Sequence, residues 1–174
     1  TTSGAIKEYP VDYSHLNILG TCVGAVGIEA ESEKATFPTV SVETEIGAQN
    51  RMKMKLPVFT GALGSTEIAR VNWEPMAIGS AISGISVVIG ENVAGMDPNA
   101  EYKHGRVVKS PELERRIKSY LEWYEGYGAI IVQYNVEDGR TGVPELALKY
   151  GAHAIEAKWG QGAKDIGGEV KIAD

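Results

Sequence analysis

Four short apolar runs, separated by segments of helical character, constrain the fold of this chain more than any other feature. The runs begin near Leu56, Ile85, Ala129 and Ala154. Short apolar runs bounded by glycine are typical of strands that are buried on both faces, and strands that alternate with helices form parallel sheets. The sequence therefore predicts an α/β fold built of about four strand–helix units.

Helix signals lie between these runs. Ser65-Thr66-Glu67 is typical of a helix start, and Pro75 is expected to interrupt that helix or to begin a second one. Ser110-Pro111-Glu112 combines a cap, a proline in the first turn and an acid near the positive end of the helix dipole. Turn-forming residues predict irregular structure at 90–105 and a loop at 138–142.

The first part of the chain, residues 1–54, differs from the rest. Gly20, Gly24 and Gly27 lie in the apolar stretch LGTCVGAVGIEA, but the closely spaced first pair of the dinucleotide-binding motif G-x-G-x-x-G is missing. This pattern favours a glycine-rich packing segment over a nucleotide site. We expect residues 1–54 to be an N-terminal extension that packs on the α/β part, residues 55–174.

Charge and cysteine content argue against several classes of protein. The formal net charge is −6, whereas a nucleic-acid partner normally requires clustered lysine and arginine. Cys22 is the only cysteine, so this chain alone forms no internal disulfide and no thiolate-rich metal or iron–sulfur site. No apolar run approaches the roughly 18 residues of a membrane span, and no secretory signal is visible, so we expect a cytoplasmic protein without a membrane or nucleic-acid partner.

Polar and small residues gather directly after each predicted strand. In parallel α/β folds, ligands bind beyond the carboxyl ends of the strands. The residues at these positions are the small residues 60–65, then Glu91, then Gln133 and Asn135, and finally Lys158, Gln161 and Lys164. The sequence therefore predicts a ligand site where these strand ends meet.

The two lysines suggest the chemistry of the ligand. Lys158 follows an apolar run, where a cation is costly unless it meets an anion or an electron-rich ring, such as the negatively charged N1–C2=O edge of a reduced flavin. Lys164, in a glycine-rich loop, suits a carboxylate or phosphate. The residues also allow structural roles: a solvated strand edge for both lysines, a helix cap for Glu91, and hydrogen bonds to buried backbone for Gln133 and Asn135.

The segment AIEAKWGQGAKDIGGEV, residues 154–170, resembles the Q-G-A-K-P-G-E-G-G segment that follows a strand in the FMN-binding domain of the glutamate synthase family. KLPVFTGALGS (55–65) and VVIGENVAGMD (87–97) resemble that family's first two barrel strands with their glycine-rich turns, in the same order. GRTGVPELALKYGAHAIEAKWGQGAK (139–164) resembles the stretch from the third strand to the fourth. The resemblance covers about residues 38–172.

This resemblance implies a partial (β/α)₈ TIM barrel that carries FMN at its C-terminal face. In the family, reduced FMN passes a hydride to 2-iminoglutarate, formed from 2-oxoglutarate and ammonia, to give glutamate. By position, the resemblance implies flavin contacts for Gly61, Ala62, Gln133 and Lys158. It likewise implies dicarboxylate binding by Gln161 and Lys164, and catalytic roles for Glu91 and Lys164.

The chain also departs from the family pattern. Asp165-Ile166 replaces the Pro-Gly after the lysine, and Glu91-Asn92-Val93 replaces Glu-Gly-Gly, which stiffens both loops. Because a closed barrel needs eight strands, we expect this chain to be a fragment of a longer polypeptide or one piece of a split barrel. An iron–sulfur cluster and an electron-donating subunit would then belong to the complete protein. Two alternatives stay open: a related FMN enzyme such as a methylamine–glutamate transferase subunit, and a non-catalytic barrel subunit of a larger assembly.

Overall fold

The structure is a computed structural model that describes residues 10, 15, 41–158 and 160. By its internal contacts the chain divides into two units, Thr1–Ser41 and Val42–Asp174. The sequence had suggested a boundary between residues 54 and 55. The following description concerns the second unit.

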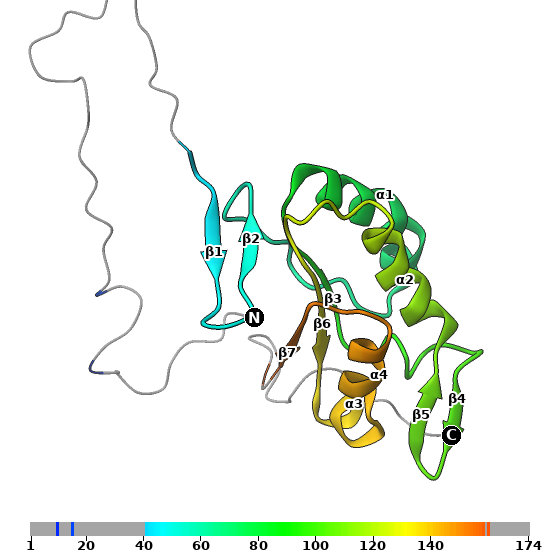
Figure 1. Ribbon diagram of the computed structural model, residues 1–174. Helices are drawn as coiled ribbons and strands as arrows, with labels where there is room; N and C mark the ends of the chain where they lie inside the picture. Colours follow the sequence, from blue (N-terminus) through cyan, green and yellow to red (C-terminus); the bar gives the residue numbers. More distant parts are fainter. Residues whose placement is uncertain (1–9, 11–14, 16–40, 159, 161–174) are drawn as a thin grey trace, which may run out of the picture. The chain divides into compact units, whose positions relative to one another are not determined.

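A parallel sheet forms the centre of this unit (Figure 1). Its strands follow one another in the order β3 (Val87–Ile89), β6 (Ile130–Tyr134) and β7 (Ala154–Ala157). Val88 lies opposite Ile131, and Val132 lies opposite Ile155. These strands confirm the predictions made from the apolar runs near Ile85, Ala129 and Ala154.

The first apolar run lies along the free side of β3, but it is not a regular strand. Within residues 58–63, the N–H of Leu63 donates to the carbonyl of Val88 (3.1 Å), and the N–H of Gly90 donates back to the carbonyl of Leu63 (2.8 Å). Between the Phe59–Ser86 and Leu63–Ile89 bridges, the hydroxyl of Thr60 accepts from the N–H of Val88 (3.1 Å), which interrupts the backbone ladder. The segment is therefore a distorted fourth parallel strand, and the order of strands in space follows their order in the chain.

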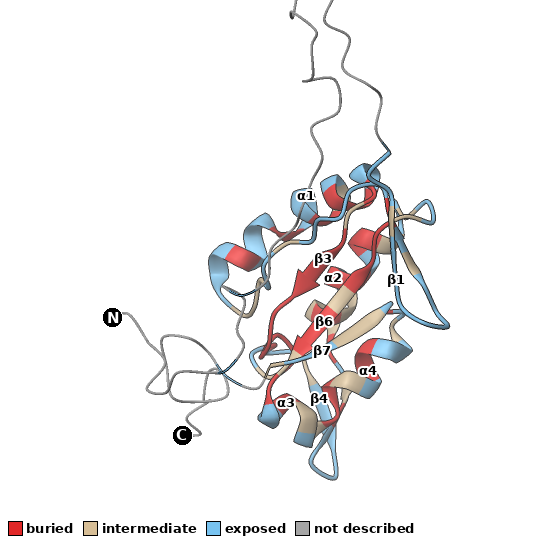
Figure 2. Cartoon of the chain, turned by 90° about the vertical axis from the view of Figure 1, so that its left-hand side faces the viewer, coloured by how far each residue is buried: buried red, intermediate tan, exposed pale blue. Residues whose placement is uncertain are grey.

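Three helices cover the same face of this sheet. They are α1 (Glu67–Ser83), α2 (Pro111–Leu121) and α4 (Val143–Lys149). Helix α1 packs on α2 and on β3, α2 packs on β6 and α4, and α4 packs on β6 and β7. The core between helices and sheet includes Trp73, Ala77, Ile89, Leu113, Ile117 and Val132. Most of β3 and β6 is accordingly buried (Figure 2).

Both predicted helix starts are confirmed. The hydroxyls of Thr66 and Ser110 accept hydrogen bonds from the backbone three residues later, so they cap α1 and α2. The prediction that Pro75 interrupts the first helix is wrong, because α1 continues through it. Pro75 lies on the exposed side of α1, where water can hydrate the carbonyl of Val71 that loses its helical donor.

Two segments that were predicted to be irregular contain regular structure. The end of the segment 90–105 contains β4 (Glu101–Lys103), which forms an antiparallel hairpin with the following strand, β5 (Arg106–Lys109). Its two turn residues, His104 and Gly105, both have positive φ, which is the conformation that tight hairpin turns require. The predicted loop at 138–142 is largely a short helix, α3 (Val136–Thr141).

A second hairpin, β1 (Thr44–Ile46) with β2 (Met52–Met54), precedes the first apolar run. The α/β class predicted from the sequence is thus confirmed. The parallel sheet formed by the described residues is open and does not close into a barrel. Among these residues, no helix is both long enough and apolar enough to cross a membrane.

Candidate ligand site at the carboxyl ends of the strands

Three of the predicted site residues lie at the carboxyl ends of neighbouring strands. Glu91 follows β3, Gln133 lies near the end of β6, and Lys158 follows β7. The N–H of Lys158 donates to the carbonyl of Tyr134 (2.9 Å), which fixes its backbone beside the end of β6. We call Glu91, Gln133 and Lys158 the rim residues.

Lys158 and Glu91 form an ion pair across the strand ends. The ammonium Nζ of Lys158 lies 2.7 Å from Oε1 of Glu91, and the two side chains are only 18% and 10% exposed. The lysine is therefore not a solvated strand edge. Because the pair is largely removed from water, its charges interact more strongly than those of an exposed pair.

Gln133 offers an unused acceptor beside this ion pair. Its Nε2 donates to Oε1 of Glu156 (2.9 Å), whereas its buried Oε1 accepts no hydrogen bond from any described residue. Side chains alternate along a strand, and Val132 faces the helices, so Gln133 faces the opposite side of the sheet. Ser86 lies on that side too, at the other end of β3, and its buried hydroxyl likewise has no partner among the described residues. The face of the sheet opposite α1, α2 and α4 therefore holds buried polar atoms that have no hydrogen-bond partner among the described residues.

A cluster of three polar side chains holds the loop that carries Glu91. The N–H of Asn92 donates to Oδ2 of Asp138 (2.8 Å), and Nδ2 of Asn135 donates to Oδ1 of Asn92 (3.1 Å). The Oδ1 of Asn135 accepts from the N–H of Asp138 (2.9 Å) and so caps α3. Asn92 has φ 65°, in the left-handed region that asparagine tolerates better than most residues. Asn135 thus has the structural role that the sequence left open.

Asp138 is an unusual carboxyl group in this cluster. The pKa of Asp138 is raised to about 6, chiefly by burial and to a smaller extent by the nearby carboxylates of Glu137 and Glu91, although the hydrogen bonds from the backbone of Asn92 and at Asn135 oppose this shift. Asp138 does not stand out in the sequence as a site residue, because the segment around it has the composition of a loop. Only the tertiary contact with Asn92 places it next to the rim residues.

The remaining predicted site residues differ in where they lie. Gly61 and Ala62 are exposed, and no atom beyond its immediate neighbours would contact a Cβ placed on Gly61. The turn that they form thus leaves backbone accessible, as the predicted flavin contact requires. Gln161 and Lys164 lie outside the described residues.

Histidine has a structural role near the sheet. Nδ1 of His153 accepts a hydrogen bond from the N–H of Ile130 (3.0 Å), and burial lowers the pKa of this imidazole. Among the described residues, no group of three histidine, cysteine or acidic side chains is arranged to hold a metal ion.

A hollow of about 450 Å³ lies apart from the rim residues, at the N-terminal ends of α1 and α2. Arg70, Arg115 and Arg116 line it together with Glu67 and Glu112. Arg70 pairs with Glu67, Arg115 and Arg116 share Glu112, and Asp97 also lines the hollow, so three carboxylates balance the three arginines. The ion pair and the unused Gln133 acceptor make the strand ends the better candidate site.

The coupling free energy of the ion pair between Glu91 and Lys158 can be measured. We expect a double-mutant cycle of Glu91→Gln and Lys158→Met to give a coupling free energy of about 1–2 kcal/mol, between the values typical of exposed and of fully buried pairs. Urea unfolding of the wild type, both single variants and the double variant measures it. Additive effects of the two substitutions would show that the pair does not form in solution.

Comparison with known proteins adds no identification. No family model, no curated protein and no solved structure matches this chain.

Proposed function

We propose that this chain forms the N-terminal half of a flavin-dependent oxidoreductase barrel of the glutamate synthase type, with FMN at the carboxyl ends of its strands. The observation that carries the proposal is the largely buried Lys158–Glu91 ion pair beside the unused acceptor of Gln133. A largely buried ion pair often stabilises a fold no better than apolar side chains of similar volume, and this one lies at the edge where ligands of parallel α/β folds bind, which supports a role in ligand binding.

The strand order supports a barrel over a doubly wound sheet. Four parallel segments are neighbours in the order of the chain, and α1, α2 and α4 cover one face. A doubly wound sheet reverses its strand order and places helices on both faces, whereas a barrel continues in one direction with all helices outside. The polar atoms of Ser86 and Gln133 would then face the barrel interior.

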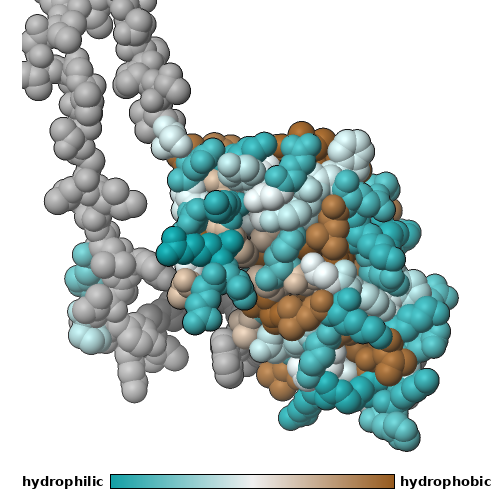
Figure 3. Space-filling view, in the orientation of Figure 1, coloured by the Kyte–Doolittle hydropathy of each residue, from teal (hydrophilic) through white to brown (hydrophobic). Residues whose placement is uncertain are grey.

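The free edge of the sheet supports a continuation of the barrel. Ser86 exchanges hydrogen bonds with Val58 and Thr60, so the N–H and C=O of Phe59 point away from β3, and the Phe59 side chain is 58% exposed. Helix α1 is apolar on its exposed face as well as on its buried face. The exposed apolar side chains of α1 are Ile68, Val71, Met76 and Ile82, and apolar patches are visible over this helix (Figure 3). Unpaired edges and two-faced apolar helices normally require a covering partner, which is here the rest of the barrel.

The rim residues fit a flavin. The ammonium of Lys158 would stabilise the negative N1–C2=O edge of the reduced ring, and Oε1 of Gln133 would accept from a ring N–H. The open backbone at Gly61 and Ala62 allows a flat ring to approach. When bound, FMN supplies the hydride that reduces the imine carbon of 2-iminoglutarate, and a proton on nitrogen completes glutamate. Gln161 and Lys164 would hold the two carboxylates, and an electron-donating subunit would reduce the flavin.

Glu91 would control the charge of Lys158 in this proposal. While the ion pair is closed, the lysine is neutralised and the site tolerates an uncharged oxidised flavin. A negative reduced ring competes with Glu91 for the same ammonium. Glu91 would therefore adjust how much more tightly the site binds reduced flavin than oxidised flavin.

The visible spectrum of the protein purified as it exists in the cell tests the proposal. We expect the absorption bands of bound flavin, and a loss of at least about tenfold in FMN affinity for Lys158→Met, which corresponds to about 1.4 kcal/mol. Lys149→Met is the matched control, because Lys149 is exposed on α4 and should not affect binding. A colourless protein that takes up no FMN would overturn the proposal.

A further inference from the structure

We infer that Arg116 is a positioning residue, which acts from outside the sheet to hold the turn at Leu63–Gly64 and thereby fixes Glu91 at the rim. Arg116 belongs to α2, and its side chain forms no hydrogen bond or ion pair with the rim residues. The contacts by which Arg116 holds the turn do not depend on the proposed function. Only the expected effect on FMN binding rests on that function.

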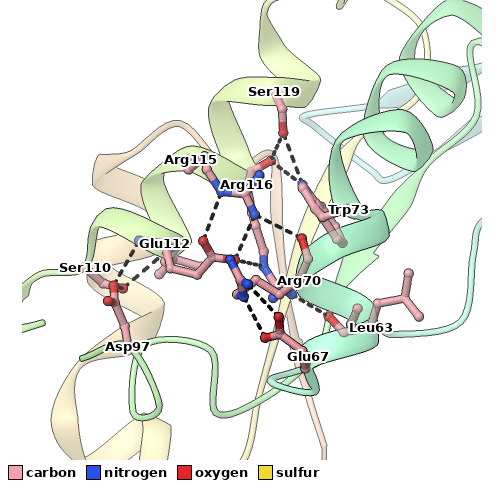
Figure 4. A network of polar contacts seen from close by, with 12 residues as sticks. Leu63, Glu67, Arg70, Trp73, Asp97, Ser110, Glu112, Arg115, Arg116 and Ser119 are labelled. Atoms are coloured by element: carbon pink, nitrogen blue, oxygen red, sulfur yellow. Dashed lines mark hydrogen bonds and ion pairs between the residues drawn. The ribbon is translucent and has the colours of Figure 1, made fainter. Parts of the chain in front are cut away.

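Arg116 is an arginine in an unusual place. Its side chain is 1% exposed and lies between α1 and α2 (Figure 4). The guanidinium Nε donates to Oε1 of Glu112 (2.7 Å), and Nη1 donates to the carbonyls of Leu63 (3.2 Å) and Gly64 (2.9 Å). The side chain therefore connects a helix to the turn that follows the first strand.

The surroundings hold this guanidinium in one orientation. Its Cζ lies 5.3 Å from the centre of the Trp73 ring, within cation–π distance. The indole N–H of Trp73 in turn donates to the backbone carbonyl of Arg116 (2.9 Å) and to the hydroxyl of Ser119 (3.1 Å). Trp73 of α1 thus contacts both the guanidinium and the backbone of Arg116, which restricts the orientation of this side chain.

A buried guanidinium needs a reason, because apolar side chains of similar volume often stabilise such a place equally well or better. The carbonyls at the end of the first strand supply that reason. The carbonyl of Leu63 already accepts from the N–H of Gly90, and the guanidinium gives it a second donor. The carbonyl of Gly64 receives its hydrogen bond from Arg116. Only a side chain with several donors in a fixed plane can serve both carbonyls and Glu112 together.

The turn transmits this constraint to Glu91 by direct backbone contact. A Cβ on Gly64 would lie 3.0 Å from the carbonyl oxygen of Glu91, and a Cβ on Gly90 would lie 2.6 Å from the nitrogen of Gly64. The two backbones are therefore as close as glycine allows. A shift of the turn toward β3 would push on Gly90 and Glu91, and a shift away from β3 would break the hydrogen bond from Gly90 to Leu63, so either shift would loosen the position of the carboxylate that binds Lys158.

Arg115 provides a matched control within the same helix. It also pairs with Glu112 (2.9 Å), but its side chain is 41% exposed and it gives no hydrogen bond to Leu63 or Gly64. Substitutions at the two neighbouring arginines therefore remove similar charge and similar ion pairing. They differ in whether the turn loses its donors.

Hydrogen exchange of the wild type and of Arg116→Met, Arg116→Lys and Arg115→Met tests the inference. The amide of Gly90, bonded to Leu63, reports on the turn, and the amide of Val87, bonded to Ala129 at the other end of β3, is the internal reference. We expect Gly90 to exchange at least about tenfold faster relative to Val87 in both Arg116 variants, and at the wild-type ratio in Arg115→Met. A general loss of stability would accelerate both amides together and leave their ratio unchanged.

FMN affinity is the second measurement, and it separates the two proposals. If the wild type binds FMN, we expect the Arg116 variants to bind it about fivefold or more weakly and Arg115→Met to bind it normally. If the wild type binds no FMN, the proposed function fails while the exchange ratio still decides the role of Arg116. An unchanged Gly90 to Val87 ratio in Arg116→Lys, which keeps the charge and so guards against misfolding of the methionine variant, would overturn the inference.

Discussion

Alanine at position 90 is expected to destabilise the folded protein by about 3 kcal/mol, although it adds a single methyl group. Its Cβ would lie 2.6 Å from the nitrogen and 2.7 Å from the Cα of Gly64, and 2.9 Å from the carbonyl carbon of Leu63. These are backbone atoms, so no side-chain rotation relieves the overlap. Separating the two segments breaks the hydrogen bond from Gly90 to Leu63. Overpacking of this kind typically costs about 1–3 kcal/mol, and rigid surroundings place it at the upper end.

Urea unfolding of Gly90→Ala, with Gly61→Ala as the control, measures this cost. Gly61 lies in the facing segment, three residues before Gly64, has ordinary φ, and would place its Cβ in open space, so we expect a change within about 0.5 kcal/mol. Equal stability of the two variants would show that the first strand and β3 are not in close backbone contact. That result would also remove the path by which Arg116 fixes Glu91.

The elements that could be predicted from the sequence are those set by local chemistry. The helix caps at Thr66 and Ser110 depend on a side chain and a backbone N–H three residues apart. The strands at Val87–Ile89 and Ile130–Tyr134 depend on short apolar runs that only a two-sided core can bury. Such signals are contained within a few residues, so they need no knowledge of the tertiary structure.

The wrong predictions concern segments in which tertiary contacts override local tendency. Residues 138–142 have the composition of a loop, yet α3 forms because Asn135 caps it and Asp138 holds the neighbouring turn. Pro75 is tolerated inside α1 because the carbonyl that it leaves without a donor lies on the exposed face of the helix. Neither contact can be read from residue order alone.

At the candidate site, too, some features could be predicted from the sequence and others depend on tertiary contacts. Strand order alone predicted that Glu91 and Lys158 would lie at a common edge, since parallel strands end together. The partners of Gln133 and Asn92, which are Glu156 and Asp138, depend on the register between strands and on the position of α3. The role of Arg116 could not be predicted, because the sequence of a helix does not indicate which distant carbonyl groups one of its arginines contacts.

The stability of Asp138→Asn relative to the wild type is expected to depend strongly on pH. The pKa of Asp138 is raised from 3.8 to about 6 in the folded protein, chiefly by burial. The folded state therefore binds this proton more tightly than the unfolded chain, and the carboxyl group stabilises the fold at low pH. That contribution is lost as the pH rises from about 4 to about 6. A shift of roughly two units corresponds to about 3 kcal/mol.

Urea unfolding at several pH values between about 4 and 7 measures this effect as a difference. Because asparagine does not ionise, we expect the unfolding free energy of Asp138→Asn minus that of the wild type to increase by up to about 3 kcal/mol over this range. Glu125→Gln is the control, since that exposed side chain is not one of the groups that raise the pKa of Asp138, and its removal should change stability by no more than about 0.5 kcal/mol. A difference for Asp138→Asn that does not change with pH would mean that the carboxyl group is solvated. The loop of Asn92, and with it Glu91, would then lack the buried anchor that connects it to α3.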